Sequence, residues 1–371
     1  MAFMVDGQKT RNYFYKLRLK GDIEMRVGII GHFMFKGDQC NGQAIKTLNY
    51  YKELQKHYKN EVLYLDTLNV KKSLIYNSFV LLKMCIVCRA IIFMPTKALL
   101  YRGAIILNCL KKIFKFKLIY VVVGGWLPEE VSCNFKLKKE LDKFEAILVE
   151  TKLMKTNLEK QGMKNIYYSP NFSTKVVPNN LKKNRSNIVP FKYCTFSRVT
   201  KSKGILDAIK AISLVNQRAG KRICSLDIYG PVDEEFKKEF FSVVESYDEV
   251  SYCGVLNNKN TIGVLSEYYA MLFPTQYAGE GFPGAVVEAM MAGTPVIASD
   301  WKYNSEVIID GKTGYIYPVG DIELLVRLIE KLNNDKNITY AMSETSKEYS
   351  KKYSADQVMK VLYQFIEEPK I

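Results

Sequence analysis

The sequence predicts an α/β protein whose parallel strands alternate with helices that cover both faces of each sheet. Short apolar segments in the first half are separated by segments of helical character, and they lie at residues 27–30, 62–65, 91–94, 118–123 and 147–149. Such alternation favours a parallel sheet with helices on both faces. The alternation restarts at residue 191, after a polar, proline-bounded stretch at 173–190. A strand-to-helix unit at 273–293 carries two glutamates and is the most informative stretch.

Composition and charge set the outer bounds. The chain has 371 residues, of which 48% are hydrophobic and 25% are charged, as in a folded protein of two or three domains. Residues 1–200 contain 35 lysines and arginines against 14 acidic residues, whereas residues 201–371 contain 19 against 24. This asymmetry indicates an anionic partner, either nucleic acid or an anionic membrane surface. We find no recognition motif or aromatic platform for nucleic acid, so we expect none to bind.

Cysteine and histidine usage argues against a metal site. The eight cysteines are scattered singly apart from Cys85 and Cys88, which lie in an apolar run typical of core packing. Only two histidines, His32 and His57, are present, and no Asp-x-Asp motif occurs. A histidine-based zinc site is therefore not expected. Residues 1–24 lack the apolar core of a signal peptide, so we expect reduced thiols in the cytoplasm and a disordered, vector-derived or upstream-start extension.

The first strand leads into a glycine-bearing loop that includes Gly31, His32 and Gly42, and a helix is expected at 43–57. Such a turn lets backbone amides approach a phosphate closely, although a plain tight turn is equally consistent. His32 is a candidate cleft residue, or a histidine satisfied within the turn. At the end of strand 118–123, Gly125 and Trp126 are candidates to contact a ligand, and simple packing of the tryptophan is the alternative.

Residues 70–116 combine apolar side chains with recurring lysine and arginine. No stretch reaches the roughly 18 uncharged apolar residues of a membrane-spanning helix. The mixture instead suits a non-spanning attachment to anionic lipid. Buried helices with solvated lysines are the alternative, and the regional charge favours a peripheral position on the inner face of the cytoplasmic membrane.

In the second half, a strand at 193–197 ends beside Arg198 and Lys203, and a helix follows at 205–217. A guanidinium and an ammonium at the mouth of a strand suit a diphosphate. Basic loop residues are common, so this pair alone is weak evidence for a site.

The stretch 273–293 places Glu280 before a helix that begins near Pro283, and Glu288 about two turns along it. Such a crevice is where ligands bind in open α/β sheets, and ionised carboxylates there suit sugar hydroxyls. An ordinary βα unit with two solvated glutamates is the alternative.

These residues carry a resemblance to a known family. The spacing of Glu280 and Glu288, with seven residues between them, resembles the signature of GT-B retaining glycosyltransferases of family 4, also described as glycosyl transferases group 1. A second resemblance is to their diphosphate-binding motif, in which an arginine is followed after four residues by Lys-Gly, as Arg198 is followed here by Lys203-Gly204. Three features depart from the pattern: Pro283 directly follows Phe282, Gly-Gly-Trp stands where many members have histidine, and no glycine-rich turn precedes Glu306.

The resemblance implies two Rossmann-like, doubly wound domains facing across a cleft. The expected divisions are residues 25–172 for the acceptor domain, 173–190 for the linker, 191–352 for the nucleotide-sugar domain, and 353–371 for a helix crossing back to the first domain. It also implies that Arg198 and Lys203 hold the diphosphate, Glu280 the donor sugar, and Glu288 the ribose. Further substrate contacts are expected from the residues Gly281, Phe282, Pro283, Gly284, Gly254 and Val255.

The implied activity is metal-independent, retaining sugar transfer, of the hexosyltransferase type, without a cofactor. We expect a UDP-sugar donor and a saccharide or lipid-linked acceptor in bacterial capsule or O-antigen synthesis. Three alternatives remain: a GT-B enzyme of another reaction such as a nucleotide-sugar epimerase, a nucleic-acid-binding protein, and a non-catalytic membrane scaffold.

Overall fold

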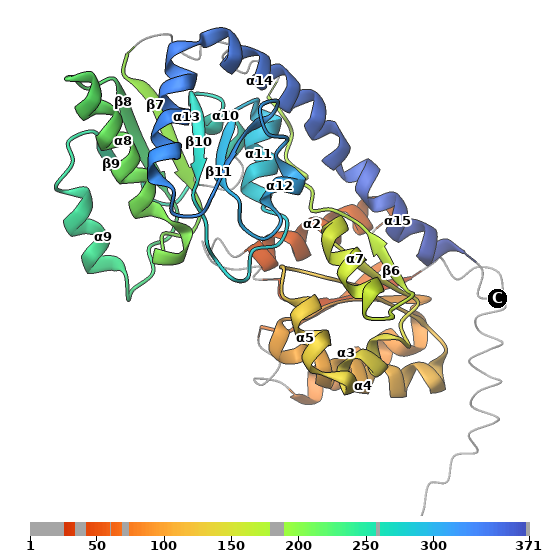
Figure 1. Cartoon of the computed structure of the whole chain (residues 1–371). Coiled ribbons are helices and arrows are strands. Elements are labelled where there is room, and N and C mark those ends of the chain that lie inside the picture. Colours follow the sequence, from red (N-terminus) through yellow and green to blue (C-terminus); the bar gives the residue numbers. More distant parts are fainter. Residues whose placement is uncertain are drawn as a thin grey trace, which may run out of the picture.

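The computed structural model describes residues 26–33, 42–59, 61–68, 74–178, 189–256 and 260–368. The expected extension at 1–24 and most of the expected linker at 173–190 lie outside these ranges. The described chain forms two units, each built around a six-stranded parallel sheet with flanking helices (Figure 1). The predicted α/β architecture is thereby confirmed. Along the described ranges, none of the helices combines the length and apolar character needed to cross a bilayer.

The N-terminal unit has the strand order β2-β1-β3-β4-β5-β6. Its strands are β1 (Val27–Gly31), β2 (Val62–Asp66), β3 (Ala90–Met94), β4 (Lys117–Val121), β5 (Ala146–Val149) and β6 (Ile166–Tyr168). Its helices are α2 (Gly42–His57), α3 (Leu74–Val87), α4 (Lys97–Phe114), α5 (Leu127–Cys133), α6 (Phe135–Leu141) and α7 (Lys152–Lys160).

The inner strands β1, β3, β4 and β5 are buried on both faces, which explains why they are mainly apolar. In β3, Ile91 and Phe93 join the core on one face, whereas Ile92 and Met94 join the core on the other. Successive side chains of a strand point to opposite faces, so a sheet covered by helices on both sides needs apolar residues throughout. Cys85 and Cys88 are buried in the first of these cores, in agreement with the core packing predicted for them.

The C-terminal unit has the strand order β12-β11-β10-β7-β8-β9. Its strands are β7 (Phe191–Phe196), β8 (Cys224–Tyr229), β9 (Val250–Tyr252), β10 (Ala270–Phe273), β11 (Val296–Ser299) and β12 (Gly314–Tyr317). Its helical elements are η2 (Lys201–Lys203), α8 (Ile205–Ala219), α9 (Lys237–Val244), α10 (Thr261–Leu265), α11 (Gly284–Ala292), α12 (Asn304–Val307), α13 (Ile322–Asn334) and α14 (Lys336–Ser350).

The strand order reverses between β7 and β10, which are hydrogen-bonded neighbours. In open α/β sheets, ligands bind outside the carboxyl ends of the strands at this switch point. The loop after β7 carries Arg198 and Lys203, and the loop after β10 carries Glu280. The topology therefore brings the separately predicted basic and acidic residues to one edge of the sheet.

The end of the chain returns to the N-terminal unit (Figure 1). After α14, the short turn η3 (Lys351–Tyr353) leads into α15 (Ala355–Glu367). Val358, Met359, Leu362 and Ile366 of α15 are buried in the same core as β1 and β3. The last helix therefore covers part of the N-terminal sheet.

Candidate active site

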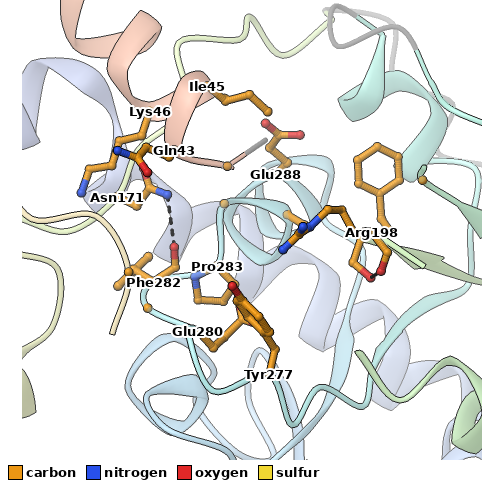
Figure 2. Close-up of a pocket in the computed structure, with 18 of the residues that line it drawn as sticks. Gln43, Ile45, Lys46, Asn171, Arg198, Tyr277, Glu280, Phe282, Pro283 and Glu288 are labelled. Atoms are coloured by element: carbon orange, nitrogen blue, oxygen red, sulfur yellow. Dashed lines mark hydrogen bonds between the residues drawn. The ribbon is translucent and has the colours of Figure 1, made fainter. Parts of the chain in front are cut away.

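A cavity of about 370 Å³ lies between the two units and is lined by residues of both. The N-terminal unit contributes the start of α2 and the loops after β4, β5 and β6. The C-terminal unit contributes the loops after β7, β8 and β10 and the start of α11. Figure 2 shows labelled residues of both units around this space. The four residues that the resemblance assigns to the diphosphate, the donor sugar and the ribose all line the cavity, namely Arg198, Lys203, Glu280 and Glu288. Pro283, at the expected start of the helix, lines it as well.

Arg198 and Lys203 follow β7 and line the cavity. The Arg198 side chain is exposed, and its guanidinium carbon lies 5.7 Å from the centroid of the Tyr277 ring. Lys203 ends the turn η2, and Gly204 then adopts the left-handed conformation with a φ of 68°. A Cβ at Gly204 would lie 2.0 Å from the Pro274 carbonyl oxygen, so only glycine permits this close approach.

Glu280 is held by two polar neighbours. Its Oε2 accepts hydrogen bonds from Lys203 Nζ at 2.5 Å and from Thr275 Oγ1 at 2.9 Å. The two charged side chains are only 10% and 11% exposed, so water screens their attraction weakly. The Lys203 ammonium also lies 4.9 Å from the Tyr277 ring centroid. A cation and an anion are thus fixed side by side at the sheet switch point.

Glu288 lies on α11 and is 7% exposed. One carboxylate oxygen lies 2.6 Å from Lys175 Nζ, and the other accepts from Thr261 Oγ1 at 2.8 Å. Lys175 Nζ also donates to Thr261 Oγ1 at 2.6 Å. Lys175 comes from the segment that leaves β6, so the linker supplies a counter-charge to this carboxylate.

The start of α11 matches the expected helix. Pro283 is the residue before the first turn, and Gly284 and Ala285 line the cavity directly after it. The first amides of a helix have no intrahelical acceptor and suit an anion. Phe282 is 3% exposed and its ring packs 5.0 Å from that of Tyr353.

The Gly-Gly-Trp segment differs from the expectation. Gly125 does not line the cavity but packs against the other unit, because a Cβ there would lie 2.0 Å from the Glu280 carbonyl oxygen. Its N–H donates to the Gly279 carbonyl at 3.3 Å, and its carbonyl accepts from Tyr303 Oη at 3.1 Å. Trp126 does line the cavity, with Nε1 donating to the Val123 carbonyl at 3.0 Å. Close contact between the units, rather than ligand approach, explains the glycine.

The remaining expected substrate contacts divide into two groups. Gly281, Gly42 and Val255 line the cavity. Gly31, His32 and Gly254 are absent from the described lining, and the loop at 34–41 lies outside the described residues. Gly31 is buried beside Thr47 and Met94, because it forms the end of β1 within the sheet. Gly254 follows β9 with a φ of 75°, in a turn toward the lining residue Val255.

Several cavity residues were missed by the sequence argument. Lys46 of α2, Glu150 after β5, Asn171 after β6 and Tyr277 after β10 all line the cavity. Glu150 and Asn171 follow the ends of parallel strands, a position that could have indicated them. Lys46 carries no such signal, since it resembles any other lysine of a basic helix. Within the described ranges, no group of three or more His, Cys, Asp or Glu residues could hold a metal ion.

The described chain has the fold of a known structural class. The two facing parallel-sheet units have the GT-B architecture, and the chain is similar in structure to Anabaena HepE solved in complex with UDP. That likeness has a TM-score of 0.72 at 15% identity and covers 92% of this chain and 99% of HepE. Sucrose-phosphate synthase from Thermosynechococcus elongatus is similar with a TM-score of 0.68 at 14% identity, and the likeness covers 92% of this chain and 98% of the synthase.

The sequence comparisons concern mainly the second half. Residues 177–352 match the family model of the Glycosyl transferases group 1. The amylovoran biosynthesis glycosyltransferase AmsK of Erwinia amylovora is 27% identical over 42% of this chain and 39% of its own length. The capsular polysaccharide biosynthesis glycosyltransferase CapM of Staphylococcus aureus is 28% identical over 38% of this chain and 36% of its own length. The chain thus matches less than half of the length of either relative.

Proposed function

We propose that this protein is a retaining, metal-independent glycosyltransferase that uses a nucleoside diphosphate sugar, most simply a UDP-sugar. The observation that carries the proposal is the cavity arrangement of Arg198 and the Lys203–Glu280 pair beside Glu288. Two cations suit a diphosphate, and two carboxylates suit hydroxyl groups. The relatives named above, which include glycosyltransferases of amylovoran and capsule synthesis, support the same reaction class.

In the proposed complex, Arg198 and Lys203 hold the diphosphate, Glu280 orients the donor sugar, and Glu288 accepts from the ribose hydroxyls. The acceptor hydroxyl attacks the anomeric carbon on the face from which the nucleoside diphosphate departs. The bond from the anomeric carbon to the phosphate oxygen breaks as the new glycosidic bond forms, and a phosphate oxygen takes the hydroxyl proton. The two cations offset the charge that develops on the leaving diphosphate.

The proposed acceptor is a saccharide or lipid-linked saccharide of a bacterial surface polysaccharide such as capsule or O-antigen. The N-terminal unit supplies the opposite wall of the cavity with Gln43, Asn49 and Asn171, whose amides can donate to and accept from hydroxyl groups. The wall formed by the C-terminal unit carries the two cations, Arg198 and Lys203, and the N-terminal wall carries these amides beside the paired charges of Lys46 and Glu150. This arrangement suits an anionic donor and a neutral acceptor.

Titration calorimetry with UDP, GDP and CDP in the presence of a chelator tests this function. We expect micromolar binding of one nucleotide, because the diphosphate and ribose contacts need no metal. Failure of all three to bind would contradict the proposal. Incubation of the matching sugar nucleotide without acceptor tests the epimerase alternative, which predicts an isomerised sugar nucleotide where a transferase leaves the sugar configuration intact.

We further propose that α3 and α4 attach the protein to an anionic membrane surface. Five apolar side chains of α3 are exposed, namely Leu74, Ile75, Tyr76, Phe79 and Leu82. Ile106 and Ile113 of the neighbouring α4 are also more than half exposed, and Lys83, Arg102, Lys112 and Lys115 on the same two helices or at their ends are exposed cations. Exposed apolar groups among cations suit the boundary between anionic headgroups and acyl chains.

Sedimentation with vesicles of phosphatidylglycerol and phosphatidylethanolamine checks the attachment. The double variant Ile75→Ser/Phe79→Ser is expected to bind roughly tenfold or more weakly, because two apolar side chains no longer insert. Tyr340→Ser, which alters an exposed aromatic residue of α14 in the other unit, is the matched control and should bind like the unaltered protein. Equal binding by all three proteins would contradict the proposed surface.

A further inference from the structure

One carboxylate in the cleft is bonded to both units. Glu150 follows β5 and is buried, and its Oε1 accepts from Lys46 Nζ at 2.6 Å. Its Oε2 accepts from the backbone N–H of Gly124 at 3.1 Å and from that of Phe282 at 3.2 Å. Phe282 belongs to the loop of the C-terminal unit that carries Glu280. An N-terminal side chain therefore holds the backbone of the proposed donor-sugar loop.

Lys46 fixes the orientation of this carboxylate. The Lys46 side chain is 1% exposed, and its ammonium also donates to the Val122 carbonyl at 2.8 Å. Burial lowers the pKa of Lys46 below its ordinary value, and the charge of Glu150 opposes that shift. Burying an ion pair costs desolvation energy that apolar residues of similar size would avoid. The pair is therefore better explained by what Glu150 holds than by fold stability.

The loop is held through both the backbone N–H and the backbone carbonyl of Phe282. While the Phe282 N–H donates to Glu150, the Phe282 carbonyl accepts from Asn171 Nδ2 at 3.1 Å, a bond drawn in Figure 2. Gly281 lies so close to the carboxylate that a Cβ there would meet Glu150 Oε2 at 2.2 Å. A Cβ there would also lie 2.8 Å from Gly124 Cα, so the close approach of the N-terminal unit requires the glycine before Phe282.

We propose that Glu150, oriented by Lys46, is a positioning residue that sets Glu280 against the donor sugar when the two units are closed. The inference rests on the proposed function, because it assigns Glu280 to the donor sugar. Glu150 itself takes no part in the chemistry. It links the wall formed by the N-terminal unit to the loop two residues after Glu280. The nucleotide contacts of Arg198 and Glu288 do not pass through this bond.

Two double variants separate positioning from folding. Lys46→Met/Glu150→Leu replaces the buried pair by apolar residues of similar size, which keeps the fold but removes the acceptor for Phe282. Lys46→Met/Glu150→Gln removes the same charges but leaves an amide oxygen free to turn toward the two backbone N–H groups. We expect hydrogen exchange of the Phe282 amide to rise roughly tenfold or more in the leucine variant and to stay near the original rate in the glutamine variant.

The same pair of variants has a kinetic readout. Turnover of the UDP-sugar donor should fall roughly tenfold or more in the leucine variant, with UDP affinity changed less than about threefold, and the glutamine variant should recover turnover. Glu306→Leu is the matched control, since Glu306 also crosses between the units and accepts from the N–H groups of Lys152 and Leu153 at 2.7 and 2.8 Å. Glu306 lies outside the described cavity lining. Its replacement should leave the exchange rate of the Phe282 amide, the turnover and the UDP affinity unchanged.

The outcomes distinguish this inference from the proposed function. The positioning role would be overturned if the leucine and glutamine variants had the same amide exchange rate and the same turnover. It would also be overturned if the Glu306→Leu control lost as much turnover as the leucine variant, even if the protein binds UDP. Failure of the unaltered protein to bind UDP, GDP or CDP would overturn the proposed function, and the exchange rate of the Phe282 amide would still decide whether Glu150 holds the loop.

Discussion

Replacement of both cavity cations, in the Arg198→Ala/Lys203→Ala variant, is expected to reduce sugar transfer roughly 10²-fold or more. Arg198 is exposed to the cavity and Lys203 is paired with Glu280 at 2.5 Å. The guanidinium and the ammonium would both face a diphosphate whose negative charge grows as it departs. Their loss therefore destabilises the transition state more than the ground state. Initial rates at saturating donor measure the effect.

Lys201→Ala is the control for this experiment. Lys201 lies in the same turn, η2, but its ammonium is 2.6 Å from Glu239 and it does not line the cavity. The control removes one cation from the same surface and should keep transfer within about twofold, because exposed ion pairs contribute little. Unchanged turnover in the double variant would refute the diphosphate role of Arg198 and Lys203.

The second large effect is expected for Glu288→Gln, which should weaken nucleoside diphosphate binding roughly tenfold or more. A hydrogen bond to a charged acceptor is worth more than one to a neutral amide. The substitution also leaves the Lys175 ammonium, 2.6 Å from the carboxylate, without its counter-charge beside a buried threonine. Calorimetric titration with the nucleotide that binds the unaltered protein measures the loss.

Glu323→Gln provides the comparison for that titration. Glu323 lies on α13 of the same unit and pairs with Arg218 on the surface. Its replacement removes one negative charge without touching the cavity and should leave the affinity unchanged. If Glu288→Gln binds the nucleotide as tightly as Glu323→Gln does, the ribose assignment is wrong.

The local pattern of the chain predicted the fold because the strands of both sheets are short, mainly apolar and followed by a helix or turn. Most expected elements agree with the structure within a few residues, as with the helix expected at 205–217 and observed as α8. The edge strand β12 was missed as a strand, since its glycine-bearing turn dominates the sequence there. Its pairing with β11 is a tertiary property that no local pattern records.

The candidate site was predicted only where spacing along the chain carries the information. Glu280 and Glu288 are linked by a loop and little more than one turn of the helix α11, and Arg198 and Lys203 by the short turn η2. The Lys46–Glu150 pair joins residues 104 positions apart, and Glu150 meets Phe282 across 132 positions. Gly125 was predicted to contact a ligand and instead packs against the other unit. The sequence alone does not distinguish a glycine needed for contact between two units from one that admits a ligand.

The return of α15 to the first sheet has a consequence for how the chain folds during synthesis. The buried residues of α15, which include Leu362 and Ile366, complete a core whose other buried members come from the N-terminal unit, from Val27 to Phe172. Domains generally fold in order as they leave the ribosome, at roughly 5–20 residues per second. Here the first unit waits for the last helix with part of one apolar face uncovered, for a period on the order of tens of seconds at that rate. The same face would be available to a chaperone until residues 355–367 emerge and cover it.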